Sequence, residues 1–270
     1  GGGDTRPLEI TTRSLPSGET GEPYSAKVDA AGGDGGPYAF ALAGGSLPPG
    51  VRLNPDGTLT GTPTTPGSYA ITVEARDASG AIAYYPYVIV IGDPAKPSIV
   101  PPSLPPAEEG QPYSVPLEGA GGTGPYRWDV TAGVLPPGMA LGPDGVVSGT
   151  PTTPGTYTFT VTLTDADGDR TSQDYSIVVV APGAPAIINP SVPSTNVGEP
   201  YRDHLVGEGG AGGPYTFDLV GGSLPPGVTL LPDGTLSGSP TKAGEYTITV
   251  RVYDKYGHSS VRVYTLRIGD

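Results

Sequence analysis

The sequence has no cysteine, a single methionine, a single tryptophan and only two histidines in 270 residues. The absence of cysteine excludes a disulfide framework and thiolate-bound metals, although it does not place the protein in the cytosol. No apolar run approaches the length of about 20 residues that a membrane helix needs, and no stretch has the pattern of a signal peptide.

Basic residues are also scarce. Lys and Arg together number 14 against 27 Asp and Glu, which gives a formal net charge of −13. No segment is basic, so the footprint of a phosphate-binding surface is missing and nucleic acid is not an expected partner. The excess of acids predicts a soluble, self-repelling surface.

What the sequence has in quantity is glycine and proline, 44 and 34 residues. They stand at fixed places between alternating apolar runs, where they mark tight turns of an all-β protein. One proline-rich stretch occurs three times, and its LPPG leucines are Leu47, Leu135 and Leu224. The spacing of 88 or 89 residues is too long for a solenoid unit and about the size of one β-sandwich. We therefore predict three domains, residues 1–92, 93–181 and 182–270, called repeats 1, 2 and 3 below.

Each repeat contains runs with a period of two. In repeat 1, Tyr69, Ile71 and Val73 alternate with Thr72 and Glu74. Such alternation predicts strands with one face in the core and the other in water. About seven short strands per repeat, with turn signals every 8–12 residues, predict three tandem immunoglobulin-like sandwiches.

The repeated stretch itself encodes turns. Paired prolines cannot donate to a sheet ladder, so LPPG predicts an extended crossover that the glycine turns back. Pro-Asp-Gly predicts a tight turn, because proline presets φ, aspartate hydrogen-bonds locally and glycine accepts a positive φ. By its inward register, Trp128 takes the core position that Phe40 and Phe217 fill in the other repeats.

The pattern LPPG…PDGTLSGTPT…G-Y-ITV…D resembles the immunoglobulin-like or cadherin-like repeats of large bacterial surface and secreted proteins. The resemblance covers all three repeats. It implies extracellular tandem modules that serve as stalks, spacers or adhesive arms, without enzymatic activity. The expected partners are neighbouring repeats of the same array and a protein or glycan at a cell surface, with no membrane insertion. Linkers of six or seven residues with proline are stiff, so the domains are expected end to end over about 100 Å.

The ends of the sequence are in phase with the repeat. Asp4 stands where Asp93 stands, Ile10 matches Ile99, and the final RIGD matches VIGD before repeat 2. We expect the chain to be part of a longer array, because a terminal domain that caps an array usually has an atypical sequence. A mature three-domain protein trimmed by a protease is the alternative.

Residues for catalysis are few. His204 and His258 lie in one repeat without counterparts in the others, which does not favour a nucleophile–base pair. The glycine-rich loops lack both a following helix and a Gly-Lys-Ser/Thr, so they do not predict phosphate binding. Paired carboxylates for glycoside hydrolysis stay open at this point.

One acidic turn is a candidate metal site. Asp165, Asp167 and Asp169 alternate in the segment DADGDR, and calcium prefers such clustered oxygens. The linkers contribute few acids, so an acidic hairpin turn is the favoured interpretation of the segment and the calcium site is the alternative. We expect no cofactor, with calcium as the one possible exception, and a core that folds without calcium.

The last strand of repeat 1, in AIAYYPYVIV, is apolar on its outward face as well. Tyr84, Val88 and Val90 form this candidate interaction surface. A face covered by a neighbouring domain or loop is the alternative, and Pro86 is typical of a protected sheet edge.

The sequence thus favours a non-enzymatic, extracellular or cell-surface stalk or spacer of a bacterial adhesin. Two alternatives stay open. One is a subunit of a self-assembling extracellular fibre or sheath. The other is an accessory carbohydrate-binding region of a secreted enzyme, for which Tyr84, Tyr85 and Tyr253 are the candidate aromatic residues.

Overall fold

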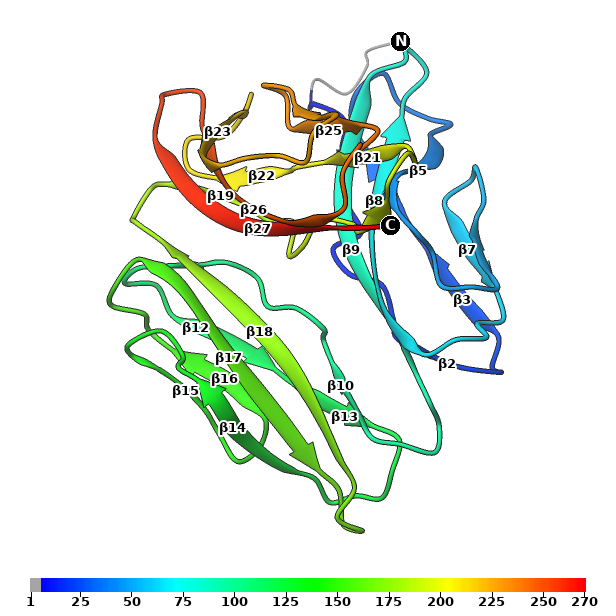
Figure 1. Ribbon diagram of the computed structural model, residues 1–270, viewed down its shortest axis with the longest axis vertical. Coiled ribbons are helices and arrows are strands. Elements are labelled where there is room, and N and C mark those ends of the chain that lie inside the picture. The colour runs from blue at the N-terminus through cyan, green and yellow to red at the C-terminus, as the bar shows by residue number, and fades with distance from the viewer. Residues whose placement is uncertain (1–5) are drawn as a thin grey trace.

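A computed structural model describes residues 6–270, so Asp4 lies outside the described residues. Every regular element in this range is a β-strand, and the strands form three successive sandwiches (Figure 1). The predicted fold class, three tandem immunoglobulin-like sandwiches, is confirmed. Each sandwich has nine strands rather than about seven, because the first strand of each repeat divides between two sheets and several pairings involve only two or three residues.

The strands of repeat 1 are β1 (Glu9–Ile10), β2 (Gly18–Glu19), β3 (Tyr24–Lys27), β4 (Ala30–Ala31), β5 (Ala39–Gly45), β6 (Val51–Leu53), β7 (Thr58–Gly61), β8 (Gly67–Arg76) and β9 (Ile82–Gly92). Those of repeat 2 are β10 (Ser98–Val100), β11 (Ala107–Glu108), β12 (Tyr113–Pro116), β13 (Glu118–Ala120), β14 (Arg127–Gly133), β15 (Met139–Leu141), β16 (Val146–Gly149), β17 (Gly155–Thr164) and β18 (Arg170–Val180). Those of repeat 3 are β19 (Pro185–Ile187), β20 (Thr195–Asn196), β21 (Tyr201–His204), β22 (Gly207–Gly209), β23 (Thr216–Gly222), β24 (Val228–Leu230), β25 (Thr235–Gly238), β26 (Gly244–Tyr253) and β27 (Ser259–Gly269).

All three repeats share one topology. In repeat 1 a four-stranded sheet runs β2-β9-β8-β5, a three-stranded sheet runs β3-β7-β6, and β1 pairs with β4. The pairing is antiparallel except between β2 and β9, which run parallel. The long hairpin of β8 and β9 therefore forms the centre of the larger sheet. The outer face of this sheet is available to other parts of the molecule.

The core follows the predicted period of two. Ile71, Val73 and Ala75 of β8 are buried, as are the corresponding Phe159, Val161 and Leu163 of repeat 2. Sheet burial of this kind contributes on the order of 25 cal/mol per Å² of apolar surface. Trp128 packs against its core in the predicted inward register, although it stays partly exposed, unlike Phe40 and Phe217. The indole lies against the adjacent turn, where a Cβ on Gly145 would be 2.8 Å from its Cε2 atom.

The Pro-Asp-Gly turns have the predicted geometry. Gly57 has φ +91°, and a Cβ at this position would lie 2.4 Å from the carbonyl oxygen of Val28. In the same turn the carboxylate of Asp56 accepts the amide and the hydroxyl of Thr58. Only glycine combines the positive φ with this close approach, which explains why the turn recurs unchanged.

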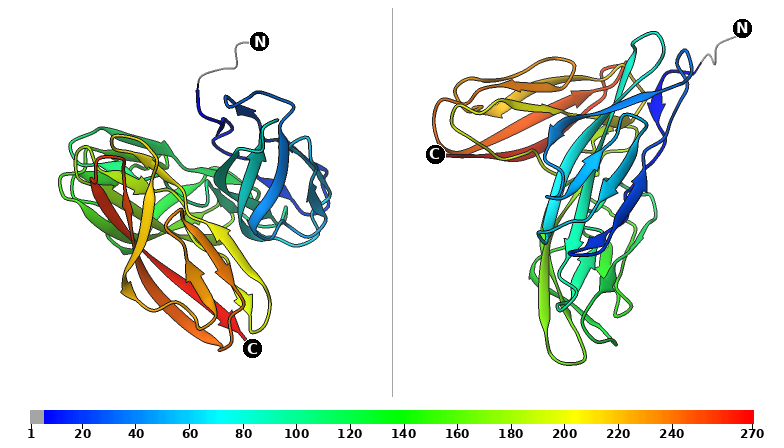
Figure 2. Two further views of the ribbon diagram at one scale, coloured as in Figure 1. Left: turned by 90° about the horizontal axis from the view of Figure 1, so that it is seen from above. Right: turned by 90° about the vertical axis from the view of Figure 1, so that its right-hand side faces the viewer.

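The three sandwiches do not lie end to end, so the extended arrangement expected from the linkers is wrong. Repeat 3 turns back and packs beside repeat 1, while repeat 2 extends away from both (Figures 1 and 2). At the turn, Val178 and Val180 of β18 form a small buried cluster with Ala184 and Ala186. This apolar joint fixes the direction in which repeat 3 leaves repeat 2. In residues 6–270 there is no helix with the length and apolarity required to cross a membrane.

Candidate functional site

The most specific contact in the molecule joins repeat 1 to repeat 3. Strand β21 lies across the outer face of the sheet that contains β5 and β8 (Figure 1). At its centre the hydroxyl of Thr72 donates a hydrogen bond of 2.6 Å to Oδ1 of Asp203. Both residues are almost completely buried, with exposed fractions of 2% and 3%. We call this contact the repeat 1–3 clamp.

A charged group flanks the central hydrogen bond. The carboxylate of Glu74 lies 3.2 Å from Nε of Arg76 and 3.4 Å from Nη2 of Arg202 in the other repeat. The side chain of Glu74 is 8% exposed, so the ion pairs hold a carboxylate that burial alone would disfavour. The predicted wet face of β8 is therefore wrong at Thr72 and Glu74, because repeat 3 covers it.

An aromatic stack closes the other side of the clamp. The rings of Tyr84 and His204 are stacked with centroids 3.7 Å apart and an interplanar angle of 17°. Burial lowers the pKa of His204 to about 4 against the opposing attraction of Asp233, so the imidazole is neutral at pH 7. Its Nδ1 lies 3.2 Å from the hydroxyl oxygen of Thr235. The histidine is thus a neutral packing residue held between two repeats.

A glycine allows the two repeats to approach so closely. A Cβ on Gly44 of β5 would lie 2.5 Å from Oδ1 of Asp203 and 2.8 Å from the carbonyl oxygen of Arg202. Contacts this short do not occur between real atoms, so a side chain at this position would separate the repeats. Ala43, the extra residue of the β-bulge beside it, is 2% exposed.

Asp203 occupies an unusual position in its own sandwich. It pairs with the fully buried Leu236, in the register that Ala26 and Val115 hold in the other repeats. Burial raises the pKa of Asp203 to about 6, and the hydrogen bond from Thr72 opposes this shift. An acid in this apolar register is a sequence signal for the clamp that local periodicity alone does not reveal.

The predicted interaction surface lies on the same side of repeat 1. Tyr84 is part of the clamp, Val90 is 8% exposed, and Val88 lines a cleft described below. Tyr85 lies beneath the guanidinium of Arg13, which is 5.1 Å from its ring centroid. Arg13 in turn forms an exposed 2.9 Å ion pair with Glu208 of repeat 3. Tyr84 and Tyr85 therefore do not present open faces on which a sugar could stack.

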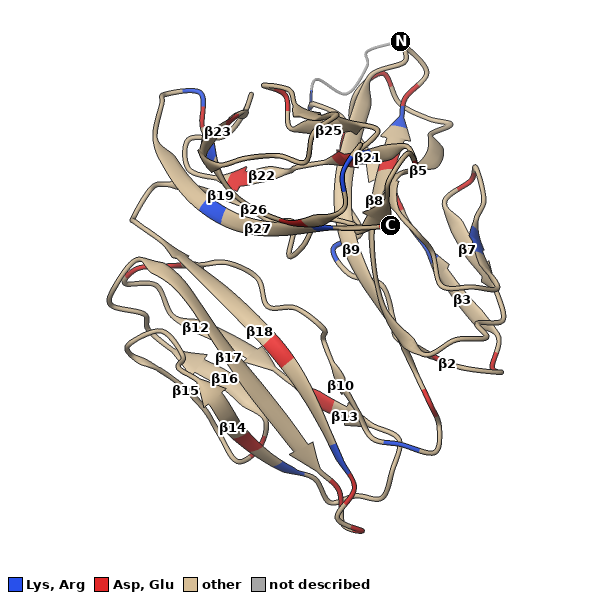
Figure 3. Cartoon of the chain, viewed as in Figure 1, with Lys and Arg blue, Asp and Glu red and all other residues tan. Residues whose placement is uncertain are grey.

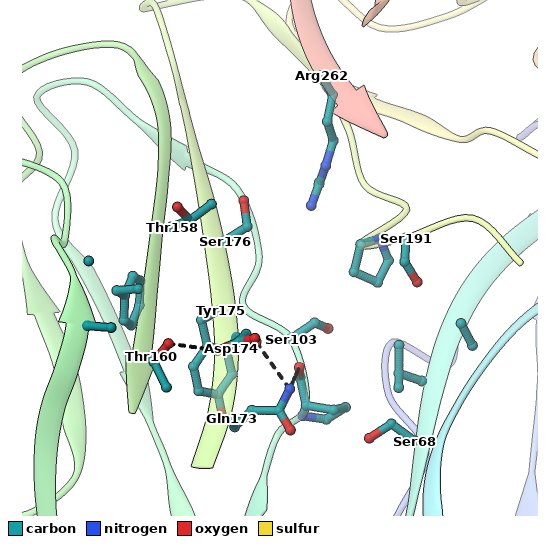
Figure 4. A pocket seen from close by; sticks show the side chains of 17 residues that line it. Ser68, Ser103, Thr158, Thr160, Gln173, Asp174, Tyr175, Ser176, Ser191 and Arg262 are labelled. Atoms are coloured by element: carbon teal, nitrogen blue, oxygen red, sulfur yellow. Dashed lines mark hydrogen bonds between the residues drawn. The ribbon is translucent and has the colours of Figure 1, made fainter. Parts of the chain in front are cut away.

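A cleft of about 620 Å³ opens where the three repeats meet (Figure 4). Hydroxyls from all three repeats line it, among them Ser68, Thr158 and Ser191. Arg262 points toward it from β27, but its Nη1 donates to the carbonyl oxygen of Ile187 at 2.8 Å. On the opposite wall, Thr160 donates to Asp174. Arg262 and Thr160 are thus engaged within their own repeats.

The predicted calcium ligands lie in the turn between β17 and β18. The carboxylate of Asp165 accepts three backbone amides, those of Thr123, Asp167 and Asp169, at 2.8–3.1 Å. These bonds lower the pKa of Asp165, the amide of Thr123 contributing most. Asp167 and Asp169 are exposed, and no three His, Asp or Glu side chains within residues 6–270 converge to hold a metal. The calcium site stays a prediction.

An aspartate accepts a corresponding set of backbone hydrogen bonds in each of the other two repeats. Asp77 accepts amides of Asp34, Ser79 and Ala81, and Asp254 accepts those of Ala211, Tyr256 and His258. Each aspartate ties the long hairpin to a glycine-rich loop. The loops that resemble phosphate cradles are therefore anchored by carboxylates.

Charges of both signs are interspersed over the three sandwiches (Figure 3). Packing, hydrogen bonds and ion pairs join the repeats. Three successive sandwiches of one topology define a tandem immunoglobulin-like repeat protein. Comparison with known families agrees. The sequence model of the family described as "Putative Ig domain" matches residues 6–92, 96–180 and 184–269, and the chain belongs to this family.

Among curated proteins, the chain is similar to the "Serine-rich adhesin for platelets" of Staphylococcus aureus (strain MRSA252). The two are 29% identical over 150 residues, which is 54% of this chain and 11% of the adhesin. The match thus spans a small part of that much longer protein.

Solved structures with similar folds include Drosophila N-cadherin EC1-4, with a TM-score of 0.34 at 16% identity over 98% of this chain and 76% of that chain. An endo-fucoidan hydrolase from glycoside hydrolase family 107 gives a TM-score of 0.27 at 20% identity over 98% of this chain and 44% of that chain. Overlaps at these TM-scores carry no functional argument.

Proposed function

We propose that this chain is a non-enzymatic structural region of an extracellular or cell-surface bacterial protein. The family and the similarity to part of an adhesin support this assignment. Its three repeats form one angled unit that sets the direction of whatever the protein carries.

The buried hydrogen bond between Thr72 and Asp203 is the observation that carries the angled unit. A flexible or extended spacer needs no buried carboxylate between its first and third domains, because burying an acid costs free energy unless it is well partnered. The clamp residues are specific to one pair of repeats, since β3 and β12 have Ser-Ala-Lys and Ser-Val-Pro where β21 has Arg-Asp-His. Such specificity supports a fixed bend rather than a string of independent domains.

Labelling of intact bacteria tests the location. An antibody raised against residues 6–270 should stain whole cells that express the parent protein, and protease treatment of the cells should remove the stain. Staining only after permeabilisation would contradict the proposal. A glycan array probed with the purified chain separates the carbohydrate-binding alternative, which predicts selective binding to particular glycans.

A further inference from the structure

The outer sheet of repeat 3 corresponds to the clamp surface of repeat 1. Strand pairing places Gly221 opposite Thr249 in repeat 3, as Gly44 stands opposite Thr72 in repeat 1. Repeat 2 differs, because Ala132 replaces the glycine and its Thr160 hydroxyl is bonded to Asp174. Repeats 1 and 3 thus share the two features that admit a docking strand, whereas repeat 2 has neither.

In repeat 3 this surface is uncovered and apolar. Val220, Val261 and Val263 take the positions of Ala43, Tyr84 and Pro86. Their exposed fractions are 41%, 39% and 49%, and Ala43 by comparison is 2% exposed. A Cβ on Gly221 would approach only the side chain of Thr249, at 3.2 Å, so the space above this glycine is open. Three exposed valines clustered on one sheet face are typical of an interaction surface.

The charge at the centre of the surface is reversed. Arg251 stands where repeat 1 has Glu74, the residue that pairs with Arg202 of the docking strand. Within residues 6–270, Arg251 forms no ion pair and Thr249 forms no side-chain hydrogen bond. A strand that docked as β21 does would therefore need a carboxylate where β21 has Arg202. The corresponding residues of the other two repeats, Ser25 and Ser114, are not acidic.

We infer that the outer sheet of repeat 3 is a second clamp surface, and that it binds another immunoglobulin-like repeat whose docking strand carries a carboxylate in place of Arg202. The inference rests on the proposed function as a region of tandem repeats. The charge reversal makes the two clamps selective: Arg202 fits repeat 1 and is repelled by repeat 3, and the acidic strand behaves in the opposite way.

The chain itself provides the probe. Gly44→Trp opens the repeat 1–3 clamp in every variant, because any side chain at this position overlaps Asp203. Adding Arg202→Glu then converts the freed β21 into a strand of the required chemistry. Gly44→Trp alone is the matched control, since its free strand keeps the arginine. Arg251→Glu or, as a second route, Val263→Asp removes the acceptor surface. Circular dichroism and melting verify that each variant is folded.

Sedimentation velocity at concentrations up to about 1 mM protein measures the self-association of each variant. We expect the Gly44→Trp/Arg202→Glu chain to self-associate at least about tenfold more tightly than the Gly44→Trp chain. Adding Arg251→Glu or Val263→Asp should abolish this gain. Equal association of the chains with and without Arg202→Glu, or association that survives both acceptor changes, would overturn the inference. Cell labelling tests the surface location separately. Failure of the second clamp surface is therefore distinguishable from failure of the proposed function.

Discussion

Thr72 and Asp203 are 131 residues apart in the chain and share a buried hydrogen bond of 2.6 Å. The contact joins the outer face of one sandwich to the edge strand of another. It gives the three repeats a defined bend, and it places two titratable groups, Asp203 and His204, at one interface with pKa shifts in opposite directions.

Replacing Asp203 by Asn should stabilise the protein at pH 8. The folded-state pKa of about 6 is above the usual value near 3.9, so ionised Asp203 destabilises the fold above pH 6 by roughly 3 kcal/mol, and this penalty disappears as the pH falls toward 4. Asparagine keeps an acceptor for Thr72 without the charge. Urea unfolding at pH 8 measures the gain, with Thr72→Val as the control that removes the hydrogen bond instead. A loss of stability in Asp203→Asn at pH 8 would contradict the assignment.

The contribution of His204 to stability has the opposite pH dependence. Its folded-state pKa of about 4 lies below the usual 6.5, so its contribution to stability is present above pH 6.5 and is lost as the pH falls toward 4. In the native chain this loss offsets the gain from Asp203 over the same range. Charged groups near the ring are Glu74, Arg202 and Asp233.

The variants should separate the two effects. His204→Phe keeps an aromatic ring against Tyr84, and its stability should rise as the pH falls from 6 to 4. Asp203→Asn should lose stability over that range, and the native chain should change little. If stability changed with pH in the same way in all three proteins, the opposite effects assigned to Asp203 and His204 would be refuted.

Much of each sandwich could be predicted from the sequence, whereas the clamp could not. The strands, the turns and the inward register follow from local periodicity and from glycine and proline, which act within a few residues. Thr72 and Glu74 look like ordinary residues of a wet face, and only the placement of repeat 3 buries them. The composition of the linkers gave no direction for the chain, because the bend depends on the apolar joint that includes Val178 and Ala186. Two local signs pointed to a contact: Asp203, an acid in an apolar register, and the apolar outward face of β9 with Tyr84, which stacks on His204.

Removal of calcium should leave the fold intact. Chelator should not change the melting temperature, because backbone amides already occupy the carboxylate of Asp165. Asp165→Ala should lower the melting temperature of repeat 2, since three amides lose their acceptor, while Asp167→Ala in the same turn is the neutral control. A chelator-dependent fall in melting temperature would establish the calcium site instead.

The fluorescence of the single tryptophan reports on the folding of repeat 2. Trp128 packs against the core and is partly exposed, so we expect emission between that of buried and free indole and partial quenching by acrylamide. Trp128→Ala should destabilise repeat 2 by about 3 kcal/mol, the lower end of the range for buried aromatic residues. Phe217→Ala in repeat 3, where the ring is buried, should cost more. Fully exposed emission would show that the register of β14 is wrong.

Small-angle X-ray scattering of the native chain and of Gly44→Leu tests the bend most directly. A leucine at this position would overlap Asp203, whereas Gly221→Leu, at the corresponding position of repeat 3, meets only Thr249 and is the matched control. We predict that the native chain and the control scatter as one compact, bent particle and that Gly44→Leu has a larger radius of gyration. Identical curves for all three proteins, with a maximum dimension on the order of the 100 Å expected for domains end to end, would contradict the clamp.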